Sequence, residues 1–126
     1  MNKKLIELLS SKDSNNVKLG VILANSQNYR IDEIIKYFTR HATEWTTGHG
    51  KFVRTSGYCY LIGEYRLIIS YPDRKYKNRS FICYTDFVSE SNVTIKIDSF
   101  EFNPKDVQNI VKSRLCKIVK LILYGN

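Results

Sequence analysis

The 126-residue sequence contains no long hydrophobic run, and this absence excludes two kinds of segment. No stretch approaches the roughly 20 consecutive apolar residues that a membrane-spanning helix requires. Near the N-terminus, the apolar run from Leu5 to Leu9 is interrupted by Glu7, whereas a signal peptide carries a longer uncharged core. We therefore expect a soluble cytoplasmic chain that has no membrane partner.

Cysteine is scarce, and its spacing argues against a disulfide framework. The three cysteines, Cys59, Cys83 and Cys116, are odd in number and form no C-x-x-C pair. Each has apolar neighbours in the sequence, which favours buried, reduced thiols in a reducing compartment.

Motifs for catalysis are also missing. The sequence has no glycine-rich phosphate-binding motif and no pair of carboxylates suited to acid–base chemistry. Both histidines, His41 and His49, lie in the segment 41–50, but their spacing matches no standard zinc pattern. We expect a non-catalytic chain with no metal and no cofactor. A small enzyme that uses His41, His49 and Cys59 is kept as the third alternative.

Four residue types are abundant, namely 14 Ile, 13 Lys, 10 Asn and 9 Tyr. All four have A/T-rich codons, so the composition favours an A/T-rich genome, such as that of a low-GC bacterium or one of its phages, and in the second case a host cytoplasm. The formal net charge of +8 is spread along the chain. A field of this sign attracts polyanions, although part of the lysine excess reflects coding bias.

Apolar residues recur at helical spacing throughout residues 1–40. Helices are predicted at residues 3–10, at about 15–25 and at about 31–40. We expect Asn28 to cap the third of these helices. Gly20 falls on the apolar face of the second helix. A helical glycine costs about 1 kcal/mol relative to alanine, so close packing against the first helix is the expected reason for it.

Residues 41–50 show neither the helical spacing nor the alternating strand pattern of apolar residues, so they are expected to form a loop. In this loop, Trp45 is expected either to fill a gap at the edge of the core or to anchor a partner. Aromatic and β-branched residues dominate after that. Strands are predicted at Phe52–Thr55, Tyr58–Ile62, Tyr65–Tyr71, Phe81–Val88 and Val93–Phe102. Gly57 and Gly63 are expected to mark tight connections. In the last strand, Val93, Ile95 and Ile97 alternate with polar residues, which predicts one buried face and one wet face.

Asn103 and Pro104 form a strong helix start. The apolar stripe that follows predicts a long helix over residues 104–124, although residues 118–124 also read as a strand. The whole chain, residues 1–126, is expected to be a single α+β domain. It would contain about three N-terminal helices in residues 1–40, an antiparallel sheet of about five strands in residues 51–102, and the C-terminal helix packed on the sheet.

The region from Lys51 to Tyr84 mixes cations with tyrosines. Nucleic-acid binding needs this mixture, because cations neutralise phosphates while rings stack on unpaired bases. The candidate nucleic-acid-binding residues are Lys51, Arg54, Arg66, Arg74, Lys75, Lys77, Arg79, Tyr58, Tyr60 and Tyr76. The competing hypothesis is a protein-interaction or assembly component, such as a phage accessory protein, with Trp45 as a candidate partner-binding residue. Nucleic acid and a protein partner therefore both stay open.

Overall fold

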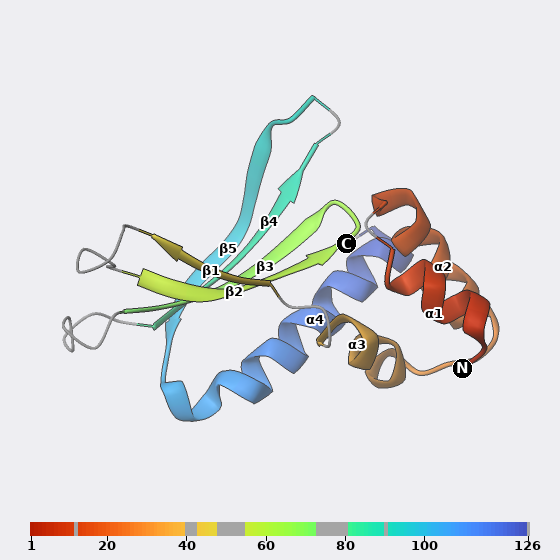
Figure 1. Cartoon of the computed structure of the whole chain (residues 1–126), viewed down its shortest axis with the longest axis horizontal. Coiled ribbons are helices and arrows are strands. Elements are labelled where there is room, and N and C mark those ends of the chain that lie inside the picture. Colours follow the sequence, from red (N-terminus) through yellow and green to blue (C-terminus); the bar gives the residue numbers. More distant parts are fainter. Residues whose placement is uncertain (12, 40–42, 48–54, 73–80, 90, 126) are drawn as a thin grey trace.

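A computed structural model describes residues 1–11, 13–39, 43–47, 55–72, 81–89 and 91–125 of the chain. For residues 39, 43–47, 55, 56, 58, 71 and 72 it describes the backbone alone. The fold class is α+β, as the sequence predicts, with helices and an antiparallel sheet in separate parts of the chain (Figure 1).

Three helices open the chain: α1 (Lys3–Leu9), α2 (Ser14–Ser26) and α3 (Ile31–Thr39). The first two begin where a side chain accepts a hydrogen bond from a free backbone N–H group. Asn2 Oδ1 accepts from the Leu5 N–H at 2.9 Å, and Asp13 Oδ1 accepts from the Asn15 N–H at 2.8 Å. The two helices pack closely at Gly20. A Cβ atom built there would lie 3.0 Å from Leu8 Cβ, which confirms the packing reason for this glycine.

The predicted cap of the third helix is wrong. Asn28 follows the end of α2 and has a left-handed backbone with φ of 67°, a conformation that asparagine tolerates better than most residues. The residue before α3 is Arg30, and its backbone N–H donates to Glu33 Oε2 at 3.4 Å. An acidic side chain in the first turn thus satisfies the free donor at the start of this helix.

Among the described residues, five strands form one antiparallel sheet in the order β1-β2-β3-β4-β5, so each strand pairs with its neighbour in sequence. Their bounds are β1 Thr43–Thr47, β2 Thr55–Ile62, β3 Tyr65–Pro72, β4 Phe81–Val88 and β5 Thr94–Phe102. Gly63, with φ of 63°, lies at the turn between β2 and β3, as expected.

Two predictions about the start of the sheet are wrong. Thr43–Thr47 is strand β1, although the segment 41–50 was expected to be a loop. Threonine and tryptophan favour strands, so the local composition was compatible with pairing. Gly57 lies inside β2 rather than at a connection, and it pairs with Trp45 on one side and Ser70 on the other. Residues 52–54 of the first predicted strand lie outside the described residues.

A β-bulge changes which side chains of β5 face the core. Thr85 pairs with Asp98 and Asp86 pairs with Lys96, so Ile97 is left without a partner. An extra residue of this kind shifts the alternation of the strand. The predicted buried face is wrong, because Ile95 remains 53% exposed and Ile97 remains 36% exposed. Phe100 and Phe102, beyond the bulge, pack against the core.

The chain then passes through a 3₁₀ turn, η3 (Pro104–Asp106), into α4 (Val107–Tyr124). Asn103 Oδ1 accepts from the Lys105 N–H at 3.1 Å, which confirms the predicted start. Residues 118–124 are helical, and the helix ends at Gly125, whose left-handed φ of 75° suits a helix C-terminus.

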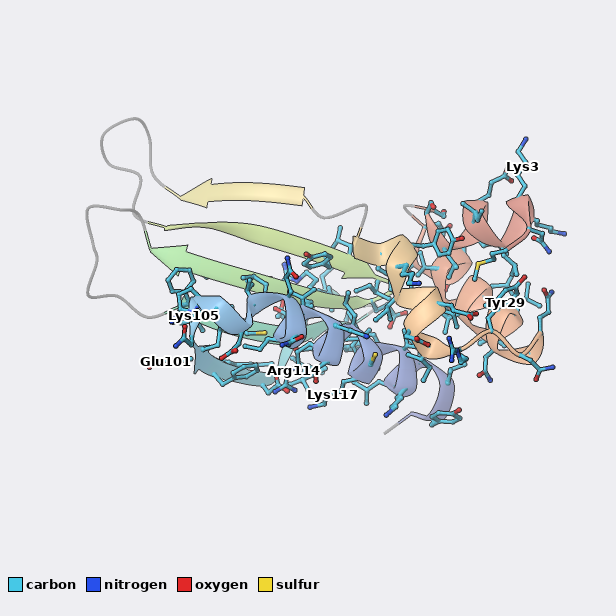
Figure 2. All side chains as sticks on the ribbon, turned by 90° about the horizontal axis from the view of Figure 1, so that it is seen from below. Lys3, Tyr29, Glu101, Lys105, Arg114 and Lys117 are labelled. Atoms are coloured by element: carbon cyan, nitrogen blue, oxygen red, sulfur yellow. The ribbon has the colours of Figure 1, made fainter. Side chains whose placement is uncertain are left out.

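α3 and α4 lie against one face of the sheet, with α4 running along it, and α1 and α2 lie beyond the end of the sheet at the turn between β2 and β3 (Figure 2). From the sheet, Ile62, Leu67 and Ile69 point into this layer and are at most 1% exposed. The helices supply the rest of the core, including Val21, Ile34, Leu115, Ile118 and Val119. No helix within the described ranges is long and apolar enough to cross a membrane.

Candidate functional site

Each of the five described strands has one of its two ends at the same rim of the sheet. The register pairs Thr47 with Thr55, Thr55 with Pro72, and Phe81 with Phe102. The chain therefore leaves β1, enters β2, leaves β3 and enters β4 at the same end, which we call the basic end. Segment 48–54 connects β1 to β2 there, and segment 73–80 connects β3 to β4.

Basic residues occur along the whole sequence, but five of the eight excess positive charges lie in the two segments that join these strands. Inside the described ranges, twelve basic residues stand against ten acidic ones, whereas the remaining residues hold eight basic and two acidic. Six of the eight excess positive charges thus belong to residues outside the described ranges. Segments 48–54 and 73–80 together carry a net +5, from six cations against Asp73. The two segments that carry most of the net positive charge are therefore both attached to strands at this rim.

Described residues at the basic end add charges of both signs. Lys105, Glu101 and Asp106 are exposed there, next to the junction of β5 and α4. Figure 2 shows Lys105 and Glu101 at this end of the molecule, and Lys3 at the opposite end. These residues lower the net charge of the basic end by one, so it remains strongly positive.

Arg66, a candidate nucleic-acid-binding residue, forms a two-pronged ion pair with Asp86. Its Nε lies 2.8 Å from Asp86 Oδ1, and its Nη2 lies 2.7 Å from Asp86 Oδ2. The hydrogen bond with Asp86 raises the pKa of the guanidinium. A bidentate pair of this kind is stronger than a single-point contact. The charge of Arg66 is thereby balanced within the sheet, so this residue offers less to a phosphate than an unpaired cation would.

Tyr60 lies on the opposite face of the sheet from Arg66. In β2 it pairs with Leu67, whose side chain is fully buried beneath the helices, whereas Arg66 is the adjacent residue of β3 and alternates to the other face. Burial raises the pKa of the Tyr60 hydroxyl. The structure thus separates these two candidates instead of bringing them together.

The other candidates are placed only in part. Tyr58 pairs with Ile69 in the register, and Trp45 pairs with Gly57. The remaining seven lie outside the described residues: Lys51, Arg54, Arg74, Lys75, Tyr76, Lys77 and Arg79. What the structure does fix is the position of the strand ends that carry them.

A second group of charges joins α4 to β5. Arg114 Nη1 and Lys117 Nζ donate to Asp98 Oδ2 at 2.7 and 2.9 Å. Burial opposes ionisation of Asp98, but the hydrogen bond from Lys117 and the charges of Arg114 and Lys117 prevail, and its pKa falls below the ordinary value. Lys117 is 43% exposed, so it meets both solvent and this carboxylate.

The cysteine and histidine candidates for chemistry do not form a described site. Cys59 lies in β2 and is half-buried, and burial raises its thiol pKa, which disfavours the reactive thiolate. His41 and His49 lie outside the described residues. Across the described part of the chain, no three His, Cys, Asp or Glu side chains cluster closely enough to hold a metal ion.

A cavity of about 550 Å³ lies between α3, the first turns of α4 and the helix-covered face of the sheet. Its apolar wall includes Ile35, Ile69, Val107 and Val111, and Tyr60 also lines it. Sequence reasoning missed this cavity. The spacing of residues 107 and 111 marks them as apolar helix positions, but nothing in that spacing shows that the space beside them stays unfilled.

No protein-family model, no curated protein and no solved structure matches this chain significantly.

Proposed function

We propose that this protein is a non-catalytic binding module that engages nucleic acid at the basic end of the sheet. The observation that supports the proposal is the convergence of strand ends: Thr47, Thr55, Pro72 and Phe81 lie at one rim, and the two segments that join them carry a net +5. A polyanion that approaches this rim meets charges from separate parts of the sequence at once.

Phosphates provide the expected attraction. Each phosphate neutralised by a lysine or arginine releases bound counterions, so affinity falls steeply as salt rises. Tyr76 lies among Arg74, Lys75, Lys77 and Arg79 in the sequence, and a tyrosine ring stacks on unpaired bases. Arg66 is a weaker contributor than the cations of segment 73–80, because Asp86 already balances its charge.

Fluorescence anisotropy with a labelled single-stranded oligonucleotide tests the proposal. The triple variant Lys75→Gln, Lys77→Gln, Arg79→Gln removes three charges from segment 73–80. It should bind at least tenfold more weakly at low salt, and the slope of log affinity against log salt should fall by about two. A matched control, Lys3→Gln, Lys4→Gln, Lys120→Gln, removes the same charge from α1 and from the C-terminal part of α4.

The comparison of the two triple variants decides the matter. If both lose the same affinity, the attraction belongs to the net charge of the molecule and the proposed interface is wrong. A wild-type protein that does not bind at low salt refutes the function itself.

One described feature favours the second candidate, a protein-interaction component. β5 is an edge strand of the described sheet; Val93, which precedes it, is 55% exposed, and Ile95, near its start, is 53% exposed. Exposed apolar side chains on an edge strand favour pairing with another chain. Size-exclusion chromatography with light scattering distinguishes this role: a complex that Ile95→Lys disrupts and Leu61→Lys leaves intact would favour it over nucleic-acid binding.

A further inference from the structure

The sheet has a second face, opposite the one that α3 and α4 cover, and no described helix packs across it (Figure 2). Successive side chains of a strand point to opposite faces. Leu67 and Ile69 of β3 face the helices and are at most 1% exposed, so Ile68 between them belongs to the second face, which we call the open face. An antiparallel sheet that leaves one face in water carries polar residues there. We propose that the open face is instead a dimer interface, on which a second copy of this chain packs with its own open face.

The centre of the open face is apolar. Cys59 of β2 pairs with Ile68 of β3, and Ile68 pairs with Tyr84 of β4, so these three residues form one row across the sheet. In a neighbouring row, Ile82 of β4 pairs with Ser70 of β3. Cys59, Ile68, Ile82 and Tyr84 all keep part of their surface accessible to solvent. Adjoining apolar side chains that are left open in this way mark interaction sites on protein surfaces.

The open face is electrically neutral, in contrast to the basic end. Its strand positions hold two cations and two carboxylates, namely Arg66, Lys96, Asp86 and Glu101. The positions on this face whose side chains lie outside the described part of the structure are all uncharged: Thr43, Trp45, Thr47, Thr55 and Pro72. Two copies can therefore meet here without net repulsion between their faces, whereas a polyanion gains no net attraction from this face.

The same charges define how the two copies are oriented. A rotation of 180° about an axis that crosses the strands along the row of Ile68 and Tyr84 places the row on one side of this centre opposite the row on the other side. Lys96 pairs with Asp86 in the first of these rows, and Glu101 pairs with Ile82 in the second. Lys96 of each copy then faces Glu101 of the other, and both residues are exposed. The rotation also carries the two basic ends to opposite ends of the dimer, where they repel each other least.

The area of the open face is sufficient for a stable dimer. β2, β3 and β4 have eight residues each, and β5 has nine. With strands about 4.8 Å apart and a rise of about 3.3 Å per residue, a five-stranded face of this length covers roughly 600 Å². Two such faces bury about 1,200 Å², which is the lower end of the range for specific, stable interfaces. We therefore expect a dimer that dissociates at about micromolar concentration.

Sedimentation velocity of the full chain over a range of concentrations tests the proposal, at low salt and after nuclease treatment and a high-salt wash, so that nucleic acid cannot bridge two copies. The mass should rise from 14.7 kDa toward twice that value as the concentration increases. Ile68→Lys places a charge at the centre of the interface and should weaken the dimer at least tenfold. The matched control Leu19→Lys, at a 46% exposed position of α2, should leave it unchanged.

A charge exchange tests the orientation of the copies. Lys96→Glu and Glu101→Lys should each weaken the dimer about tenfold, because each creates two pairs of like charges by symmetry. The double variant Lys96→Glu, Glu101→Lys has the charge of the wild type and should dimerise within about threefold of it. These exposed positions also keep the test decisive if circular dichroism shows that Ile68→Lys does not fold.

Cys59 provides a second measurement in the unaltered chain. Because it lies in the central row, its alkylation should slow as the protein concentration rises, whereas that of Cys116 on α4 should not. The proposal is refuted if the chain stays monomeric, if folded Ile68→Lys and Leu19→Lys behave alike, or if the double charge variant dimerises no better than the single ones. A dimer that Ile95→Lys separates and folded Ile68→Lys leaves intact would assign the interface to the edge of β5 and refute it too. None of these outcomes depends on whether the chain binds nucleic acid.

Discussion

Arg114 of α4 reaches across to Asp98 of β5, and its Nη1 lies 2.7 Å from Asp98 Oδ2. The same guanidinium lies 4.4 Å from the centre of the Phe100 ring, so one side chain makes both an ionic and a cation–π contact with the edge strand. Lys117, one turn further along the helix, shares the Asp98 oxygen at 2.9 Å. This relationship fixes α4 to the far edge of the sheet.

Replacement of Asp98 by asparagine should destabilise the fold by about 2 kcal/mol, because two charge-assisted hydrogen bonds lose their ionic acceptor. Chemical denaturation measures the free energy of unfolding. Asp106→Asn is the matched control, since Asp106 is exposed and caps α4 without a side-chain hydrogen bond. Equal losses in the two variants would show that the ion pair contributes nothing.

The same carboxylate predicts a pH dependence. The pKa of Asp98 lies below its ordinary value of 3.8 in the folded state, so its stabilising effect is present above that pH. It is lost as the pH falls through the folded-state pKa, because protonation then removes the charge. Denaturation between pH 5 and about 2 should show a larger loss of stability in the wild type than in Asp98→Asn. Parallel pH profiles for the two proteins would contradict this.

The bidentate contact between Arg66 and Asp86 should show energetic coupling. A double-mutant cycle with Arg66→Gln and Asp86→Asn is expected to give a coupling energy of about 1 kcal/mol, since Arg66 is 35% exposed and its charge is partly screened. Arg66→Lys should recover only part of it, because lysine cannot form the planar fork. A cycle for Arg30 and Asp32, which are more exposed and 3.6 Å apart, should give a value near zero.

Gly20→Ala should destabilise the protein by about 1 kcal/mol even though alanine is the better helix former. The new Cβ atom would lie 3.0 Å from Leu8 Cβ and 3.2 Å from the backbone nitrogen of Leu9, so α1 would have to move away. Thermal denaturation checks this. Asn25→Ala, at an exposed position of the same helix, should be neutral or slightly stabilising. A stabilised Gly20→Ala variant would show that α1 yields without cost.

The three thiols should differ in reactivity. Cys83 is fully buried, and burial raises its pKa to about 11, so both access and ionisation oppose alkylation. Mass spectrometry after a short iodoacetamide treatment should find Cys59 and Cys116 modified before Cys83. In denaturant the three should react at similar rates. Early modification of Cys83 in the native protein would show that β4 opens more readily than its burial implies.

The helices were predictable because each carries its own signal. Apolar spacing located α2 and α3 to within a few residues, and Asn103 with Pro104 marked where the last helical segment begins. Such signals are local, and the tertiary structure leaves them unchanged. Asn28 shows their limit: the same residue type suits a helix start and a left-handed turn, and the pairing of Arg30 with Glu33 decided between them.

The sheet was predictable in type but not in detail. The bulge at Ile97 exchanges the faces of β5, and the prediction missed its trace in the sequence, where apolar residues switch from Ile95 and Ile97 to Phe100 and Phe102. The cavity and the Asp98 ion pair were not predictable either, because they depend on how α3, α4 and the strands approach one another. Seven of the ten candidate nucleic-acid-binding residues lie outside the described ranges, so their role stays a prediction.

The order of the strands in the sheet suggests that this protein folds in two stages during its synthesis. Each strand pairs with the next in sequence, so the sheet can be assembled from adjacent hairpins as the chain is synthesised. Its helix-covered face cannot be completed in the same way, because Leu115, Ile118 and Val119 belong to α4, which follows every described strand. A nascent chain that has just finished β5 still exposes apolar surface, and such surface is what chaperones bind. Truncation before α4 should therefore yield an aggregation-prone chain instead of a smaller folded domain.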